Sequence, residues 1–435
     1  MKFTKGSFPQ QIVLVEIKIF DKSSLNWGGD GMSKAALEGI KVVDLTQFES
    51  GTVCTETLAW LGADVIKIER PKKGELGRYS MAEPGVDTYG FIILNANKKS
   101  ITLDLKTPKG KELLWKLIEK ADVFVENMGP GSIERLGFSY EEVNKRNPRI
   151  IYSQIKGFGL DGPWADFPAF APIAQAVGGA ACVTGDPEGP PMQPGVNLAD
   201  SGAGYLTALA IIAALYQRVS TGVGQRVEVT MQDTVIGFGR SAWEQQLRTG
   251  KPAPRVGNGM PLEPVAPANM YPCKPGGPDD YVHVYTSRHP GSTQFNKLME
   301  VIGRTDILED PRFETPRSRY KYKEELDEII SNWTRQRTKI EAMEELCRAG
   351  IPAGAALNTA EISADPYLRK RGIMTEVEHP VRGKVLIPGF IPKMSASQVP
   401  IVSSPLLGEH NDEIYRDMLG LSDEECKKLE EEGVI

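Results

Sequence analysis

The sequence predicts an α/β fold built on a parallel β-sheet, and two observations support this prediction. From Ile40 onward, short runs rich in β-branched residues alternate with longer amphipathic runs. Such alternation is typical of βαβ units, in which helices cover both faces of a parallel sheet. Around residues 252–278 the alternation gives way to proline and glycine, and strand-like segments return after residue 350. We therefore expect a large α/β domain interrupted by a smaller one.

The expected elements follow one another in a regular order. Strands are expected at residues 40–45, 65–68, 123–127, 149–155 and 226–231, and helices at 54–61, 110–121 and 201–218. The last of these helices is rich in alanine and leucine, so it should be buried. Beyond the proline-rich stretch we expect a strand at 281–285, a charged helical region at 323–349 and a final helix at 423–432.

These elements suggest how the chain divides into domains. At 435 residues it exceeds what one hydrophobic core usually supports. We expect a Rossmann-like large domain over residues 32–250, a small α+β domain over 251–349, and a return to the large domain over 350–435. Residues 1–31 look unlike the rest, so Met32 is a candidate start. A genuine extension with an edge strand at residues 12–20 is the alternative.

Composition excludes several function classes. The formal net charge of −6 gives no general attraction to nucleic acid or to an anionic membrane. The five cysteines are scattered and lack C-x-x-C spacing, which argues against a disulfide framework and a zinc site. The four histidines are equally scattered, so we expect no metal. Without a signal peptide or apolar span, the chain is expected in the cytoplasm.

One nucleotide-binding motif has to be set aside. Residues 157–162 match G-x-G-x-x-G after an expected strand, where a dinucleotide-binding fold would begin a helix. Pro163, Pro168 and Pro172 follow and prevent a continuous helix. A glycine loop near a ligand is the better interpretation. Neither a P-loop nor a G-x-S-x-G elbow is present.

Short segments in a fixed order carry a family resemblance. They are residues 62–70, 97–101, 103–106, 126–131, 135–137, 221–225 and 404–410. On these segments the sequence resembles the class III CoA-transferase family, which includes formyl-CoA transferase. The resemblance covers residues 37–231 and 350–435 and is loose between them. It implies an interlocked dimer, either of identical chains or with a related subunit.

The resemblance places a catalytic nucleophile on Asp200, at the start of the expected helix 201–218. A helix N-terminus is a favourable place for an anion. The alternative is an ordinary aspartate N-cap. By the same resemblance, CoA would be contacted by a set of residues that follow the early strands: Glu49, Arg70, Leu103, Asp104, Leu105, Lys106, Asn127, Met128, Gly129 and Arg135. Arg70, Lys106 and Arg135 would pair with its phosphates.

Two positions depart from the family pattern. Glu49 stands where formyl-CoA transferase has glutamine, and Ala171 stands where an acidic residue is common. Both are expected near the acyl group, so a succinyl-type donor and a larger carboxylate acceptor are favoured over formate and oxalate. Residues 47–52 resemble arylsuccinate enzymes such as benzylsuccinate CoA-transferase. Gly257 and Gly259 are expected in a flap over the intermediate, or alternatively in a domain linker.

The predicted activity is CoA transfer from an acyl-CoA to a free carboxylate. An aspartate with a pKa near about 3.9 is ionised at neutral pH and needs no general base to attack a thioester. No permanently bound cofactor is expected, because coenzyme A is itself a substrate. An α-methylacyl-CoA racemase is a second interpretation, weakened because no histidine precedes His283. A non-catalytic subunit of a heteromeric enzyme is a third.

Overall fold

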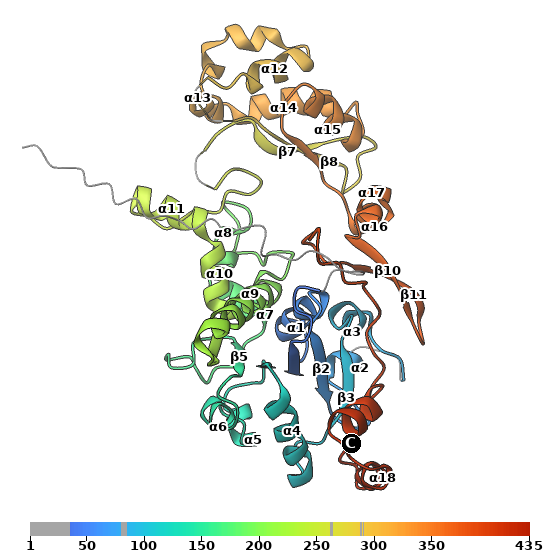
Figure 1. Cartoon of the computed structure of the whole chain (residues 1–435). Helices are drawn as coiled ribbons and strands as arrows, with labels where there is room; N and C mark the ends of the chain where they lie inside the picture. Colours follow the sequence, from blue (N-terminus) through green and yellow to red (C-terminus); the bar gives the residue numbers. More distant parts are fainter. Residues whose placement is uncertain (1–34, 80–84, 262–263, 288, 290) are drawn as a thin grey trace, which may run out of the picture.

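The large domain contains a six-stranded parallel sheet in the order β3-β2-β1-β4-β5-β6 (Figure 1). The computed structural model describes residues 35–79, 85–261, 264–287, 289 and 291–435, so the extension predicted at residues 1–31 lies outside the described part. The strands are β1 (Lys41–Leu45), β2 (Asp64–Glu69), β3 (Lys99–Thr102), β4 (Val123–Glu126), β5 (Ile151–Lys156) and β6 (Gln225–Thr230). The predicted α/β class and Rossmann-like parallel sheet are confirmed.

Successive strand residues face opposite sides of this sheet, as the period of two requires. Val42 and Val65 pack with helices α1 (Ser50–Trp60) and α9 (Leu198–Thr221) on one face. Val43 and Ile66 pack with α4 (Pro108–Lys120) and α18 (Asp423–Glu431) on the other. The apolar residues of the strands are therefore buried on both faces, which explains their nearly continuous hydrophobic runs.

Helix α9 has one buried face and one exposed face. It approaches α1 so closely that a Cβ on Gly204 would lie 2.7 Å from the Ser50 carbonyl oxygen. Among the described helices it is the only one long and apolar enough to cross a membrane, and half of its most apolar 18-residue window is buried inside the protein. Its packing on α1 and the sheet makes it a core helix of this domain.

Shorter helices complete the large domain. They are α2 (Leu76–Tyr79), α3 (Tyr89–Leu94), α5 (Ser132–Leu136), α6 (Tyr140–Arg146), α7 (Ala171–Val177), α8 (Ala180–Val183), α10 (Met231–Phe238) and α11 (Arg240–Thr249). After β5 the chain passes through bends and turns, and the next helix begins only at Ala171. The G-x-G-x-x-G segment is thus a loop, as the following prolines predict.

The small domain is built on an antiparallel sheet of β7 (Ala268–Pro272), β8 (Tyr281–Tyr285) and β9 (Ala353–Ala355). Its core joins Val282 to Leu298, Ile330 and Leu346. The helices are α12 (Gln294–Val301), η2 (Thr305–Glu309), η3 (Pro311–Phe313), α13 (Pro316–Lys321), α14 (Lys323–Thr334) and α15 (Lys339–Arg348). Strand β9 pairs with β8, so the sheet of the small domain extends past the boundary predicted at residue 349.

Beyond β9 the chain runs back to the large domain (Figure 1). It forms α16 (Thr359–Ala364), α17 (Pro366–Lys370), the hairpin β10 (Met374–His379) and β11 (Gly383–Pro388), the π-helix η4 (Glu413–Met418) and α18. The hairpin packs on Trp60 and Ile92. The Tyr415 hydroxyl then donates to the Thr102 carbonyl at 2.6 Å, so the C-terminal segment closes over β3.

Candidate active site

Two loops meet where the strand order of the sheet reverses. β1 lies between β2 and β4, so the loops after β1 and β4 diverge and open a crevice. Asn127 joins these loops: its Oδ1 accepts the Gln47 N–H at 2.9 Å, and its Nδ2 donates to the Gln47 carbonyl at 2.8 Å and to Ser50 Oγ at 3.2 Å. Gly51 permits this approach, because a Cβ there would lie 3.0 Å from Asn127 Cγ and 2.5 Å from Thr46 Cβ.

The residues predicted to contact CoA lie along the same edge of the sheet. Arg70 follows β2, residues 103–106 follow β3, residues 127–129 follow β4, and Arg135 is in α5. The carboxyl ends of parallel strands share one edge, so the fold brings these segments to one side. Arg70, Lys106 and Arg135 are exposed, whereas Leu103 is buried. Their contact with CoA stays a prediction.

Backbone and side-chain hydrogen bonds shape two of these segments. The Asp104 N–H donates to the Val434 carbonyl at 2.7 Å, so the C-terminus helps to position the turn after β3. Asp104 Oδ1 accepts the Lys106 N–H at 2.9 Å within that turn. Arg135 Nη2 donates to Ser132 Oγ at 2.9 Å. Asp104 thus shapes the turn that carries the exposed Lys106.

Asp200 lies in the first turn of α9, and Asn197 occupies the N-cap position. The alternative that Asp200 is itself the N-cap is therefore wrong. Burial, followed by the negative charge of Glu49, raises the pKa of Asp200 from 3.8 to about 6. A helix N-terminus on its own would favour the anion. Burial and the nearby negative charge both disfavour the ionised carboxylate, so they act in the same direction on this pKa.

Glu49 connects the starts of helices α1 and α9. It occupies the N-cap position of α1. Its carboxylate accepts hydrogen bonds from Asn197 Nδ2 and Ser201 Oγ of α9, each at 2.6 Å. A second carboxylate is thus held at the start of α9, where it acts electrostatically on the predicted nucleophile.

Ala171 and its neighbours border this pair of carboxylates. Ala171 is the buried first residue of α7, and Gln175 of the same helix accepts the Leu198 N–H at 2.9 Å. α7 is therefore tied to the start of α9. The exposed ring of Phe170 meets Phe48 edge-on, with centroids 6.3 Å apart. The methyl group of Ala171 supplies no carboxylate to the site. Phe48 of this aromatic pair directly precedes Glu49 in the chain.

The glycine turn predicted to form a flap packs on the loop after α8. Gly257 adopts a φ of 56°, and its N–H donates to the Gly185 carbonyl at 3.0 Å. Arg255 adds hydrogen bonds to the carbonyls of Asp186, at 3.1 Å, and Gly189, at 2.6 Å. A cavity of about 460 Å³, lined in part by Gly259, lies beside this turn. These contacts link the turn to the segment that leads into α9, and its role as a flap stays a prediction.

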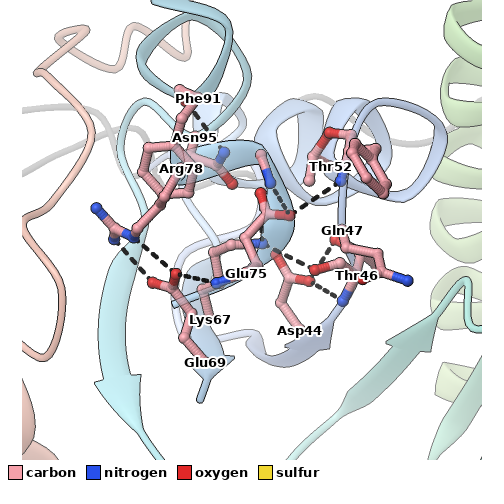
Figure 2. Close-up of polar contacts among 12 residues, drawn as sticks. Asp44, Thr46, Gln47, Thr52, Lys67, Glu69, Glu75, Arg78, Phe91 and Asn95 are labelled. Carbon is pink, nitrogen blue, oxygen red and sulfur yellow. Dashed lines mark hydrogen bonds and ion pairs between the residues drawn. The ribbon is translucent and has the colours of Figure 1, made fainter. Parts of the chain in front are cut away.

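A buried charged network beneath residues 46–49 was missed by sequence reasoning (Figure 2). Asp44 accepts the Thr46 N–H and the Thr55 hydroxyl, both at 2.7 Å, and lies 3.3 Å from Lys98 Nζ. Lys67 Nζ donates to the Thr46 carbonyl at 2.9 Å. Burial alone would raise the pKa of Asp44, but the charges of Lys98 and Lys67, together with the hydrogen bonds from Thr46 and Thr55, outweigh it and lower that pKa.

The sequence contained a signal for part of this network. Asp44 lies between Val43 and Leu45, and Lys67 lies between Ile66 and Ile68. A charge among apolar neighbours in a buried strand requires a partner. Asp44 and Lys67 are register partners in β1 and β2. Among the described residues, no group of three or more His, Cys, Asp and Glu side chains could hold a metal ion.

Comparison with known proteins identifies a matching family and several similar proteins. Residues 37–411 match the family described as CoA-transferase family III. The formyl-CoA:oxalate CoA-transferases of Streptomyces avermitilis and Streptomyces coelicolor are both 43% identical, over 92% and 93% of this chain and 99% and 100% of their own length. A CAIB/BAIF family protein from Brucella suis has a TM-score of 0.78 and 31% identity, over 89% of this chain and all of that one.

A second solved structure agrees with the first. The protein Rv3272 from Mycobacterium tuberculosis has a TM-score of 0.74 and 27% identity, over 87% of this chain and 98% of its own. The family match spans both parts of the large domain and the small domain between them. The resemblance drawn from short motifs is thereby confirmed, and with it the predicted enzyme class. The chain belongs to CoA-transferase family III, the class III CoA-transferases.

Proposed function

We propose that this enzyme transfers coenzyme A from an acyl-CoA to a free carboxylate through covalent intermediates on Asp200. The observation that carries the proposal is the position of this carboxylate. It lies in the first turn of α9, partly removed from water, beside Glu49 at the crevice between the loops after β1 and β4. Exposed cations at the same edge, Arg70 and Lys106, suit the phosphates of CoA.

The proposed reaction conserves one thioester. A carboxylate oxygen of Asp200 attacks the thioester carbonyl, the carbon–sulfur bond breaks, and CoA thiolate leaves an aspartyl mixed anhydride. The thiolate then attacks the aspartyl carbonyl, which releases the first acid and forms an aspartyl-CoA thioester. The acceptor carboxylate repeats these steps in reverse. Since one thioester replaces another, ATP is not consumed.

The environment of Asp200 suits this role. With a pKa of about 6, about nine tenths of the side chains are ionised at pH 7. The burial that raises this pKa also limits the access of water to the anhydride, which hydrolysis would destroy. The same feature of the site thus supports the nucleophile and protects its product.

Mass spectrometry of the protein after incubation with acyl-CoA tests the proposal. A productive acyl-CoA should add the mass of CoA less water to the peptide containing Asp200, and hydroxylamine should remove it. Asp200→Ala should form no adduct and lose transfer activity. Asp233→Ala is the matched control, because Asp233 is an exposed acid in the first turn of α10. Transfer by freshly purified Asp200→Ala at near the wild-type rate would disprove the mechanism.

The substrate pair is a separate proposal. The relatives named above act on formyl-CoA and oxalate by their names, which makes this pair the reference. Glu49 favours a different pair, because oxalate would bring two adjacent negative charges to a site that already holds two carboxylates. A succinyl-type donor can direct its second carboxylate away from Glu49. We therefore favour a succinyl-type donor and a larger organic acid as acceptor.

A panel of donors and acceptors decides between these pairs. Formyl-CoA and succinyl-CoA are each offered with oxalate, formate, succinate and benzylsuccinate, and both acids and both thioesters are quantified. A higher kcat/KM for succinyl-CoA with a larger acid would support our proposal. A preference for formyl-CoA and oxalate would assign the relatives' reaction to this chain and refute the argument from Glu49.

The two alternative functions are distinguished from transfer by different observations. A racemase needs a second proton-transfer group near Asp200, yet His283 and His379 lie in β8 and β10, and His410 accepts the Ser100 N–H at 3.3 Å. This placement favours transfer. If the purified chain alone formed no adduct with any donor, a non-catalytic subunit would be the better assignment.

We also propose that a second chain covers the outer face of α9. Tyr205, Leu209 and Tyr216 form an apolar stripe there, with exposed fractions of 42%, 63% and 82%. Large exposed apolar patches of this kind mark interfaces. Light scattering should give twice the monomer mass, and Leu209→Glu should lower it, whereas Lys120→Glu on α4 should not. A wild-type monomer at micromolar concentration would refute the dimer.

A further inference from the structure

Glu75 is a buried acid whose contacts have no part in the reaction proposed above. It follows β2 in the segment that begins with Arg70 and is only 8% exposed. Its Oε2 accepts the Phe48 N–H at 3.1 Å and the Gly77 N–H at 3.0 Å. Its Oε1 has no hydrogen-bond partner in the described structure and lies 3.8 Å from Lys67 Nζ.

Phe48, which Glu75 contacts, has an unusual backbone conformation. Its φ of 57° lies in the left-handed region, where a bulky side chain is unfavourable unless its surroundings hold it. The reversal of the chain at Phe48 directs the next residue, Glu49, toward α9. The interaction with Glu75 therefore acts at the residue that sets the direction of Glu49.

Each residue of the loop 46–49 has a separate anchor. Thr46 is held by Asp44 and Lys67, and Gln47 is held by Asn127. The N–H of Phe48 is held by Glu75, and the side chain of Glu49 is held by α9. In Figure 2, Glu75 and Asp44 lie on the same side of the segment that carries Thr46 and Gln47. Glu75 accepts the N–H of the strained residue, while the Thr52 hydroxyl donates to the Phe48 carbonyl from the first turn of α1.

We propose that Glu75 is a positioning residue: by accepting the Phe48 N–H it keeps the loop reversed and thereby holds the Glu49 carboxylate beside Asp200. Glu75 does not touch the reacting atoms and acts through Phe48 and Glu49. The inference rests on the proposed function, because it takes Asp200 as the nucleophile.

Two conservative substitutions separate positioning from charge. Glu75→Gln keeps the side-chain length and an oxygen acceptor but removes the charge. Glu75→Asp keeps the charge but withdraws the carboxylate by about 1.5 Å, the length of one carbon–carbon bond. The proposal predicts kcat within about threefold of wild type for Gln, because the hydrogen bond to Phe48 persists. For Asp it predicts a fall on the order of ten- to a hundredfold, because the catalytic geometry is lost.

Three further measurements exclude a merely structural effect. KM for the acyl-CoA, and the Kd for free CoA from calorimetry, should stay within about threefold in both variants, because the CoA-binding cations are unchanged. In the Glu49→Gln background, Glu75→Asp should lower kcat much less than in the wild type, because the residue it positions has changed. Glu56→Gln is the control: Glu56 is equally buried but accepts the Ala96 N–H instead.

The assay distinguishes failure of the Glu75 proposal from failure of the proposed function. The assay uses the donor and acceptor that the wild-type enzyme turns over fastest in the panel, and it records the Asp200 adduct in parallel. If the wild type forms no adduct, the proposed function fails first. If the wild type forms it and Glu75→Asp matches the wild type, positioning by Glu75 is wrong. Equal losses for Gln and Asp, or independent effects of Glu75→Asp and Glu49→Gln, would also overturn it.

Discussion

Replacing Asp200 with asparagine should stabilise the folded protein at neutral pH while abolishing transfer. In the folded state the pKa of Asp200 is about 6, against an ordinary value of 3.8. Between these pH values the unfolded chain loses a proton that the folded chain keeps, so stability falls as the pH rises through this window. The penalty is absent below pH 3.8, is complete above about pH 6, and amounts to at most about 3 kcal/mol.

Urea unfolding of the freshly purified Asn variant and the wild type, at pH 4 and pH 7.5, measures this penalty. The variant should have the higher midpoint at pH 7.5, and the difference should nearly vanish at pH 4. Asp233→Asn should show no comparable gain, because Asp233 is exposed. A variant that is no more stable than the wild type at pH 7.5, or equally stabilised at both pH values, would refute the reasoning.

Three further predictions follow from the site. Glu49→Gln should shift the acid limb of the pH–rate profile for adduct formation to lower pH, because it removes a charge that raises the Asp200 pKa. The shift should be less than half of the interval from 3.8 to about 6, because burial is the larger cause of the raised pKa. An acid limb that does not move in rapid-quench assays would contradict this. Arg70→Gln and Lys106→Gln should each weaken CoA binding about tenfold in calorimetry, with a smaller salt dependence, if they pair with its phosphates. Gly257→Ala strains a residue with a φ of 56° and should raise acyl-CoA hydrolysis relative to transfer; an unchanged ratio would identify the turn as a linker.

Five of the six strands of the large sheet could be predicted from the sequence because their signal is local, whereas β3 (Lys99–Thr102) was not among the expected strands. Val42, Val65 and Val123 belong to short β-branched runs, and parallel strands buried on both faces need such runs. β9 could not be predicted in this way. Its three residues, Ala353–Ala355, have little strand propensity, and only the pairing with β8 makes them a strand.

The candidate site was only partly predictable, for the same physical reason. Asp200, whose role as nucleophile is a proposal, was singled out through a motif in the adjacent sequence. The partners of Glu49, Asn197 and Ser201, are 148 and 152 residues away, and no local pattern joins positions so far apart. Glu75 carries no motif either, because the positioning role proposed for it depends on the left-handed backbone of Phe48, which the sequence does not reveal.

The raised pKa of Asp200 bears directly on how a carboxylate can serve both halves of a CoA transfer. A more basic carboxylate attacks a thioester faster, but protonation removes the attacking species, so the best pKa lies near or just below the working pH. A value of about 6 meets this condition at neutral pH. Full burial without Glu49 would raise the pKa while leaving the site apolar, whereas an exposed aspartate would admit water to the anhydride. In the mechanism proposed above, partial burial beside a second fixed carboxylate would therefore reconcile nucleophilicity with protection from hydrolysis, and the hydrogen bonds to residues 46–49 would keep that second carboxylate in place.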